Sequence, residues 1–367
     1  MKYDVVIQDG FKFYCVKQLK ESISSMIADI GGWPSGTSKG NKVLLKVNML
    51  AAKHPSRAIT THPAIVAAVA SLLIDRGCEV SIGDSPGGAI KGIERYWKNC
   101  GFITAAEVTG ANLVNFEGAG SEKVVIQNRE YDIAKPILEG FDCKINMCKF
   151  KTHSYTRFTN ALKNSFGIVP GLGKALLHMR SPRPVDLAVN VVDLYEIADF
   201  SLHISDGILC MDGPGPSTDG HKRHEGFVAL SKNGLHLDMI LVQMAGLPWK
   251  ELDTNAEAFR RKLGKPFDQI SVKGSHEFID FDIPPRSYLN YIPRWLGGIA
   301  RLILRTAPVS NAKCTGCGVC KRACPVDAIQ IVNGKAVMKK GDCIMCLCCH
   351  ELCPENAVEF KLPFGRK

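Results

Sequence analysis

The sequence of 367 residues contains no apolar run long enough to cross a membrane. Residues 1–10 mix Lys2 and Asp4 with short apolar stretches, which is unlike a secretory leader. The chain also lacks a basic run interleaved with aromatic residues, so its formal charge of +10 gives little support for nucleic-acid binding. We therefore expect a cytoplasmic protein that binds no nucleic acid.

Nucleotide-binding fingerprints are missing as well. The loop Asp84-Ser85-Pro86-Gly87-Gly88 carries glycine, but it has neither the Lys-Ser/Thr ending of a P-loop nor the spacing of a dinucleotide fingerprint. This absence argues against a built-in hydride carrier and leaves open whether a flavin or another organic cofactor binds. The same loop is still able to cradle an anion with its backbone N–H groups.

Disulfide bonds are not expected, although the chain has 15 cysteines. Nine of them lie between Cys314 and Cys353, and the other six are scattered, mostly in apolar contexts: Cys15, Cys78, Cys100, Cys143, Cys148 and Cys210. This distribution favours a reducing cytoplasm and an organism with anaerobic or microaerobic metabolism.

Eight of the nine clustered cysteines form two copies of one spacing, C-x2-C-x2-C-x3-C-P, which binds a pair of [4Fe–4S] clusters. Three thiolates two residues apart wrap one cluster, and the fourth, a longer step away, reaches the other. We expect one cluster on Cys314, Cys317, Cys320 and Cys353, and the second on Cys343, Cys346, Cys349 and Cys324.

The two copies also align beyond the cysteines, since 328–331 matches 357–360, and each predicts a loop followed by a short strand. This segment resembles the bacterial two-cluster ferredoxins over roughly residues 311–361. Zinc is the alternative occupant, but zinc sites favour two C-x2-C pairs or added histidines. We interpret Cys348, the ninth cysteine, as a small apolar filler.

The first 283 residues predict an α/β fold with a mainly parallel sheet and flanking helices. Strands spaced by helices of ordinary length are typical of this class. Predicted strands cover 43–48, 79–84, 111–116, 143–150, 200–205 and 227–231, and predicted helices cover 62–76, 92–100, 184–198 and 237–245. Residues 124–133 alternate like an antiparallel or edge insertion, and 206–220 predict a loop rich in glycine and proline.

Residues 284–310 predict an amphipathic linker helix between this domain (1–283) and the ferredoxin-like domain (311–367). Aromatic and aliphatic residues there are interleaved with arginines. A connecting helix docked on the core is favoured over a helix lying on a membrane surface.

Polar residues at several predicted strand ends point to one site. Ligands of open parallel sheets sit beyond the carboxyl ends of the strands. Each group alone is typical of solvated strand ends and turns, but their coincidence favours a site. The expected ligand-binding residues are Lys46, Asn48, Asp84, Ser85, Gly87, Asn160, Asn164, His178 and Asp206, with Lys151, His153 and Lys163 as the catalytic candidates.

Cationic residues dominate this predicted site, so it favours a small anionic ligand such as a carboxylate or phosphate. Lys149, Lys151 and His153 are expected to alternate onto one strand face. His153 and His178 are candidates for a general acid or base or for plain hydrogen bonding. His221 and His224, in a predicted polar loop, are either metal ligands or solvated side chains.

Several of these segments together resemble the family called domain of unknown function 362. The resemblance covers roughly residues 40–240 and runs through 44–48, 61–63, 83–87, 149–153, 161–167, 206–207 and 211–216. Lys-x-Lys-Thr-His at 149–153 and Leu-Lys-Asn at 162–164 are its most specific parts. It implies an α/β domain, often with an appended two-cluster ferredoxin module, and no agreed reaction.

Two hypotheses follow for the function. The first is an oxidoreductase in which two [4Fe–4S] clusters pass low-potential electrons to a small anionic substrate or bound cofactor in the α/β domain. The alternative is a non-enzymatic electron-transfer protein or subunit whose α/β domain docks a redox partner. A redox-neutral enzyme with structural clusters is a third, less favoured reading. The basic ferredoxin-like segment serves either its own chain or an acidic electron carrier.

Overall fold

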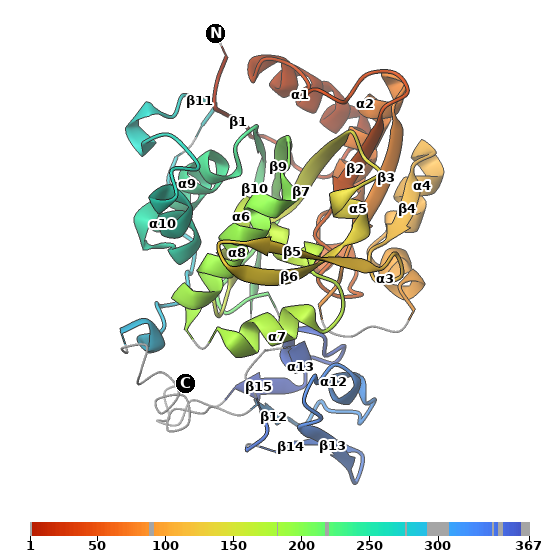
Figure 1. Ribbon diagram of the computed structural model, residues 1–367, viewed down its shortest axis with the longest axis vertical. Coiled ribbons are helices and arrows are strands. Elements are labelled where there is room, and N and C mark those ends of the chain that lie inside the picture. Colours follow the sequence, from red (N-terminus) through yellow and green to blue (C-terminus); the bar gives the residue numbers. More distant parts are fainter. Residues whose placement is uncertain are drawn as a thin grey trace.

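A large twisted sheet with helices on both faces forms the body of the molecule (Figure 1). The computed structural model describes residues 2–87, 92–181, 183–216, 220–275, 277–291, 308–339, 341–343 and 348–360. The protein is thus an α/β fold with a small α+β region at the C-terminal end, as predicted. No helix within these residues is long and apolar enough to span a bilayer.

The sheet is mixed, and its parallel part carries the predicted strand ends. Strands β9, β7, β2, β3 and β4 run parallel, whereas β10 is antiparallel to both β9 and β1. The order is β11 (Val272–Lys273), β1 (Val5–Gln8), β10 (His221–Ser231), β9 (Leu202–Asp212), β7 (Cys143–His153), β2 (Lys42–Lys46), β3 (Glu79–Asp84) and β4 (Asn112–Asn115), with β8 (Arg157–Thr159) on the end of β7.

Alternation along the strands divides the core into two layers. In β2, Val43 and Leu45 face one layer and Leu44 faces the other, because successive side chains point to opposite faces of a sheet. One layer is covered by α1 (Val16–Asp29), α2 (Pro63–Asp75) and α4 (Phe102–Thr109), and the other by α6 (Ala161–Asn164), α8 (Pro184–Ala198), α9 (Gly234–Met244) and α10 (Asp253–Arg260).

Short elements complete the α/β domain. Strands β5 (Ser121–Ile126) and β6 (Arg129–Ala134) form a separate antiparallel hairpin, which confirms the predicted insertion. The remaining helices are α3 (Glu94–Asn99), α5 (Lys135–Leu138) and α7 (Gly173–Arg180), and the 3-10 turns are Pro55–Arg57, Ser165–Ile168, Trp249–Glu251 and Phe267–Gln269.

Two strand predictions need correction. Strand β9 does not end at Asp206 but continues to Asp212, and β10 begins at His221 and pairs with this extension. The predicted loop at 206–220 is therefore partly sheet, and both His221 and His224 lie on a strand.

The ferredoxin-like region contains the two predicted repeat strands, but they do not pair with each other. Strand β13 (Ile329–Val332) pairs with β14 (Lys335–Met338), and β15 (Val358–Phe360) pairs with β12 (Pro308–Ser310). Two single-turn helices, α12 (Val319–Arg322) and α13 (Cys348–Glu351), follow the cysteine loops.

The predicted linker helix falls mostly outside the described residues, at 292–307. Residues 284–287 are not helical, Tyr288–Tyr291 form a 3-10 turn, and 308–310 belong to β12. The prediction of a helix is therefore wrong for 284–287 and 308–310. The domain boundaries at 283 and 310 stay predictions.

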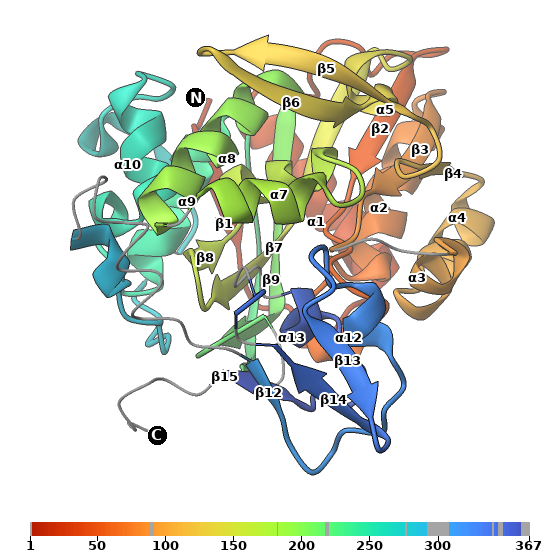
Figure 2. The same cartoon turned by 60° about the horizontal axis from the view of Figure 1, so that its bottom comes forward.

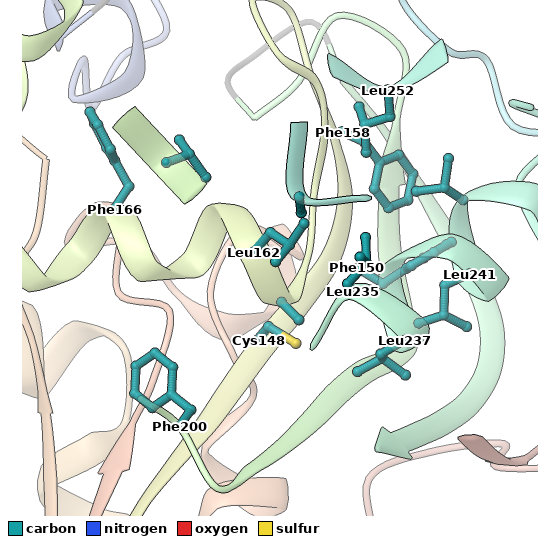
Figure 3. Packing of buried hydrophobic residues seen from close by; sticks show 14 of the residues in the cluster. Cys148, Phe150, Phe158, Leu162, Phe166, Phe200, Leu235, Leu237, Leu241 and Leu252 are labelled. Carbon is teal, nitrogen blue, oxygen red and sulfur yellow. The ribbon is translucent and has the colours of Figure 1, made fainter. Parts of the chain in front are cut away.

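Phe150 anchors the core layer beneath α9 (Figure 3). Its ring packs edge-on against Phe158, Phe227 and Phe281, with centroid distances of 4.9, 5.1 and 5.1 Å. Because the residue is fully buried, its removal leaves a cavity that the neighbouring rings cannot fill.

We expect Phe150→Ala to lower the free energy of unfolding of the α/β domain by about 3–5 kcal/mol, as for other buried Phe truncations. Urea titration followed by circular dichroism measures this change. Phe13→Ala is the matched control, because Phe13 is 67% exposed and its loss should change little. Equal effects of the two substitutions would contradict the assigned packing.

Candidate functional site: a lysine-rich pocket beside the cysteine loops

A pocket lies at the carboxyl ends of β2, β3 and β7, where the sequence predicts a site. Ten of the twelve predicted α/β site residues line it: Lys46, Asn48, Asp84, Ser85, Gly87, Lys151, His153, Lys163, Asn164 and His178. Seven further residues complete the lining: Leu50, Thr159, Phe166, Gly167, Lys174, Pro216 and Cys348. Whether they bind a ligand stays a prediction.

A buried ion pair forms one wall of the pocket. Lys46 Nζ lies 2.8 Å from Asp84 Oδ1, and the Met49 N–H donates to Asp84 Oδ2 at 2.7 Å. Burial lowers the pKa of Lys46 and raises that of Asp84, while the attraction between the two charges opposes both shifts. A Cβ at Gly167 would lie 2.3 Å from Asp84 Oδ1, so only glycine lets the chain pass this pair.

Three amides hold a second wall in one arrangement. Lys151 Nζ donates to Asn48 Oδ1 (2.9 Å), Asn48 Nδ2 donates to Asn164 Oδ1 (2.8 Å), and Asn164 Nδ2 donates to Asn146 Oδ1 (2.7 Å). Lys151 also donates to the Ile59 carbonyl. Because every link is buried, the lysine is positioned by the fold and not by solvent.

Lys174 reaches the pocket from α7. Its Nζ donates to the carbonyls of Ser85 (3.0 Å) and Val169 (2.8 Å) and contacts the Ser85 hydroxyl, which also contacts Glu117. Burial lowers the pKa of Lys174 to about 8, against the opposing attraction of Glu117 and Asp84. This lysine therefore changes its charge state at a pH slightly above neutral.

The two histidines of the pocket are neutral at pH 7. Burial, and then the nearby Lys163, holds the pKa of His153 well below its usual range and lowers that of His178 to about 3. His153 Nδ1 accepts from the N–H groups of Tyr155 (3.1 Å) and Thr156 (3.4 Å), so its proton is assigned to Nε2. His153 is therefore suited to donate a hydrogen bond, not to act as a permanent cation.

Thr159 is a site residue that no sequence signal identified. It ends β8, is 4% exposed and lines the pocket, and its hydroxyl has no hydrogen-bond partner among the residues that the structure describes. A buried polar atom without a partner is unfavourable unless a ligand or water supplies one. On the same wall, Lys163 Nζ lies 4.1 Å from the centre of the Phe166 ring.

Two predicted ligand-binding residues lie elsewhere. Asn160 donates to Asp238 (2.9 Å) and accepts from the Ser205 hydroxyl (2.6 Å), beneath α6. Asp206 forms a buried ion pair with Lys149 (2.7 Å) and accepts a hydrogen bond from Tyr14 (2.8 Å). Their side chains are already satisfied by the protein, so the assignment of both to the pocket is corrected to a structural role.

Lys149 does not share a site with Lys151, contrary to the predicted alternation. The register between β7 and β9 shifts between these two residues, so Lys149 meets Asp206 and only Lys151 lines the pocket. His221 approaches Asp212 (3.5 Å), and His224 approaches the Lys12 carbonyl. No cluster of His, Cys, Asp and Glu suited to a metal ion is found among the residues that the structure describes.

Helix α13 lies on the side of the ferredoxin-like region that faces the α/β domain (Figure 1 and Figure 2). Cys348 lines the pocket, so the interpretation of this residue as a mere filler is incomplete. An apolar cluster joins the two parts of the chain: Ala51, Ala58, Ile59, Ala175 and Met211 from the α/β domain with Ala323, Cys348 and Leu352. The next residue, Cys349, is a predicted cluster ligand, so one single-turn helix carries both features.

The four cysteines predicted to share the first cluster meet around one small cavity. Cys314, Cys317, Cys320 and Cys353 line it together with backbone of the 314–318 loop. Backbone N–H groups donate to the sulfurs of Cys314 and Cys353, at 3.3 and 3.1 Å. Donors of this kind stabilise thiolates and cluster sulfur, so the residues present fit a [4Fe–4S] cluster.

The second predicted ligand set is only partly visible. Cys324 accepts a hydrogen bond from the Ala328 N–H (3.2 Å), and Cys343 and Cys349 are described, whereas Cys346 lies outside the described residues. The assignment of these four cysteines stays a prediction.

Comparison with known proteins decides the family. The model of the family called domain of unknown function (DUF362) matches residues 43–243, which is more than half of the chain. The chain belongs to the DUF362 family. The model of a 4Fe-4S binding domain matches residues 307–330, so this DUF362 protein carries an iron–sulfur electron-transfer motif. That match includes the first cysteine repeat and does not extend to the second.

Similar proteins include the thylakoid-associated protein sll1697 of Synechocystis sp., 29% identical over 265 residues, which are 72% of this chain and 81% of the relative. Two solved structures are more distant. The match to a protein from Thermotoga maritima (TM-score 0.37, 16% identity) covers 59% of this chain. The match to the lactate racemase apoprotein from Thermoanaerobacterium thermosaccharolyticum (TM-score 0.37, 10% identity) covers 60% of this chain. This DUF362 chain covers little over half of either, 55% and 54% respectively.

Lys53 connects the DUF362 domain to the cysteine loops. Its Nζ donates to the carbonyls of Cys353 (2.7 Å) and Pro354 (3.1 Å) and lies 3.4 Å from Asn356 Oδ1. Hydrogen bonds from a charged donor contribute about 1.5–3 kcal/mol each when their geometry is good. Lys53 is thus the polar counterpart of the apolar cluster around α13.

We expect Lys53→Met to loosen the docking of α13 without unfolding either domain. The measurement is amide hydrogen exchange of residues 348–353 in the anaerobically purified full chain, which should accelerate about tenfold or more. Lys98→Met, an exposed lysine on α3, is the control. Unchanged exchange in Lys53→Met would show that the apolar cluster alone holds α13.

Proposed function

We propose that this protein is an iron–sulfur oxidoreductase. Two [4Fe–4S] clusters, bound by the two cysteine sets, would supply single low-potential electrons to a small anionic substrate or bound cofactor in the DUF362 pocket. The observation that carries the proposal is the double role of α13, where Cys348 lines the pocket and Cys349 belongs to a predicted ligand set.

An anionic ligand suits the composition of the pocket. Among the described lining residues are four lysines, and Asp84 is the one carboxylate. Bringing several ammonium groups into a desolvated pocket is unfavourable unless negative charge accompanies them. An anion bound there would gain charge-assisted hydrogen bonds, which are stronger than neutral ones.

The pocket residues divide into binding and proton-supplying groups. The ion pair of Lys46 and Asp84 fixes the ends of β2 and β3. The hydrogen bond to Asn48 holds the ammonium group of Lys151 in one position at the pocket wall. Lys163 is the proposed proton donor beside the ligand, and His153 is proposed to donate a hydrogen bond to the ligand, because its neutral imidazole carries its proton on Nε2. We place this activity in the cytoplasm of a cell with anaerobic metabolism.

The first test is native mass spectrometry of the full chain purified without oxygen. We expect the mass of the polypeptide plus two [4Fe–4S] clusters and an additional small molecule. Thr159→Val should release that molecule, because it removes the buried hydroxyl that has no hydrogen-bond partner among the described residues. Thr109→Val, whose hydroxyl bonds the Ala105 carbonyl outside the pocket, is the control.

A mass that clusters alone account for, in a protein that binds no added anion, would favour the non-enzymatic electron carrier. A mass with one cluster would refute the predicted second ligand set. Either result is read directly from the intact mass.

Anion affinity should depend on pH through Lys174. Below pH 8 this lysine is charged, so the affinity for sulfate is flat; above pH 8 it loses its proton and the affinity falls, by up to about tenfold per pH unit. His153 and His178 are already neutral at pH 7 and add no slope. Isothermal titration calorimetry with sulfate, whose own charge is constant, measures the effect.

Lys174→Met should weaken sulfate binding at pH 7 and remove the slope above pH 8. Lys144→Met is the control, because Lys144 is also partly buried with a lowered pKa but lies outside the pocket. A slope that persists in Lys174→Met would assign the titration to another group.

A further inference from the structure

Charge is distributed unequally between the two cysteine repeats. Residues 311–340 contain six Lys and Arg and one carboxylate, whereas residues 341–360 contain four carboxylates and no Lys or Arg. The second repeat provides α13, which packs against the DUF362 domain, and the first provides the β13–β14 hairpin, which points away from it (Figure 1). The first repeat also reaches the DUF362 domain through Ala323, so it is the β13–β14 side of this basic half that lies outward.

Basic side chains lie beside the exposed part of the first cysteine loop, whose cavity Glu355 of the second repeat also lines. Cys317 is exposed, Arg322 Nη2 lies 3.4 Å from its carbonyl, and Lys335 Nζ donates to the Cys314 carbonyl at 2.7 Å. Lys313 and Lys321 are exposed next to the same cysteines. Two exposed apolar residues of the hairpin, Val332 (45%) and Val337 (48%), lie on the same repeat. Exposed apolar residues together with charged ones are typical of a transient protein interface.

We propose that this surface, defined by Lys313, Lys321, Arg322 and Lys335 around Cys317, docks an acidic electron-carrier protein that delivers electrons to the first cluster. The inference rests on the proposed function only in requiring that the cysteines hold clusters. Each productive encounter transfers one electron, so that the carrier is oxidised and this chain reduced by one electron each, with no bond formed and no proton moved.

A protein carrier fits this surface better than an anionic membrane does. The cations lie beside a predicted cluster ligand, where a carrier must approach for electrons to pass, and opposite charges near such a point accelerate encounter. The described residues of this surface form loops, a single-turn helix and a hairpin, and they include no amphipathic helix of the kind that lies on bilayers.

The test is stopped-flow reduction of the full chain, reconstituted without oxygen, by a reduced acidic two-[4Fe–4S] ferredoxin. For the unmodified chain the second-order rate constant should fall steeply as salt rises, because the Debye length shrinks to about 10 Å at 0.1 M. The double variant Lys313→Glu, Lys321→Glu should lower it about tenfold or more at low salt. Both lysines are exposed, and neither side chain forms a hydrogen bond or an ion pair among the described residues, so both are replaceable without damaging the loops.

Two controls separate docking from chemistry. The double variant Lys17→Glu, Lys262→Glu changes the net charge by the same amount, at exposed positions on α1 and after α10. It should leave the rate constant of reduction by the carrier nearly unchanged. Reduced methyl viologen, which needs no docking surface, should reduce all variants equally.

A rate that is independent of salt in the unmodified chain, or equal in the two double variants, would overturn the proposal. Flotation with vesicles containing anionic lipid tests the membrane alternative, and charge-dependent vesicle binding with an unchanged carrier rate would also overturn it. Fast, charge-dependent reduction of a chain whose pocket binds nothing would support the docking surface and refute the proposed oxidoreductase. A chain with an occupied pocket whose reduction by the carrier does not depend on charge would support the proposed oxidoreductase and refute the docking surface.

Discussion

The buried pair of Lys46 and Asp84 is the constraint on which the pocket depends. It joins the ends of β2 and β3, receives the Met49 N–H, and leaves no room for a side chain at Gly167. Desolvating both charges is expensive, and a hydrophobic pair of similar size is often no less stable. The role of the pair is therefore better explained by the groups that it holds in place. It fixes an ammonium group and the turns of the chain that follow β2 and β3, at the edge of the sheet where three strands end.

Helix α13 gives that pocket its relation to the cysteine loops. It is a single turn, too short to be stable alone, so its position depends on the apolar cluster and on Lys53. The same contacts that order the helix also bring consecutive residues, Cys348 and Cys349, to the pocket and to a predicted ligand set. Docking of the two domains and closure of the pocket are thus one structural event.

Sequence periodicity was enough to predict most strands, the flanking helices and ten pocket residues, since strand ends and side-chain alternation are local properties. Asp206 and Lys149 were placed wrongly for non-local reasons. Strand β9 continues through Gly207, which pairs with Phe227 of β10 and leaves room for its ring, since a Cβ there would come within 2.2 Å of it. A register shift between Lys149 and Lys151 separates two lysines that simple alternation puts together. Thr159 and Cys348 join the pocket only through tertiary packing, which no local pattern encodes.

The unequal charge of the two repeats also bears on how the domains orient. If the ferredoxin-like region turned by its pseudo-symmetry, its basic repeat would face the lysines of the pocket, and Lys53 would meet a surface of like charge. The observed orientation instead places the acidic repeat toward the DUF362 domain. Like-charge contact at an interface is unfavourable by several kcal/mol, so the charge asymmetry favours this orientation, in which the β13–β14 hairpin of the basic repeat points outward.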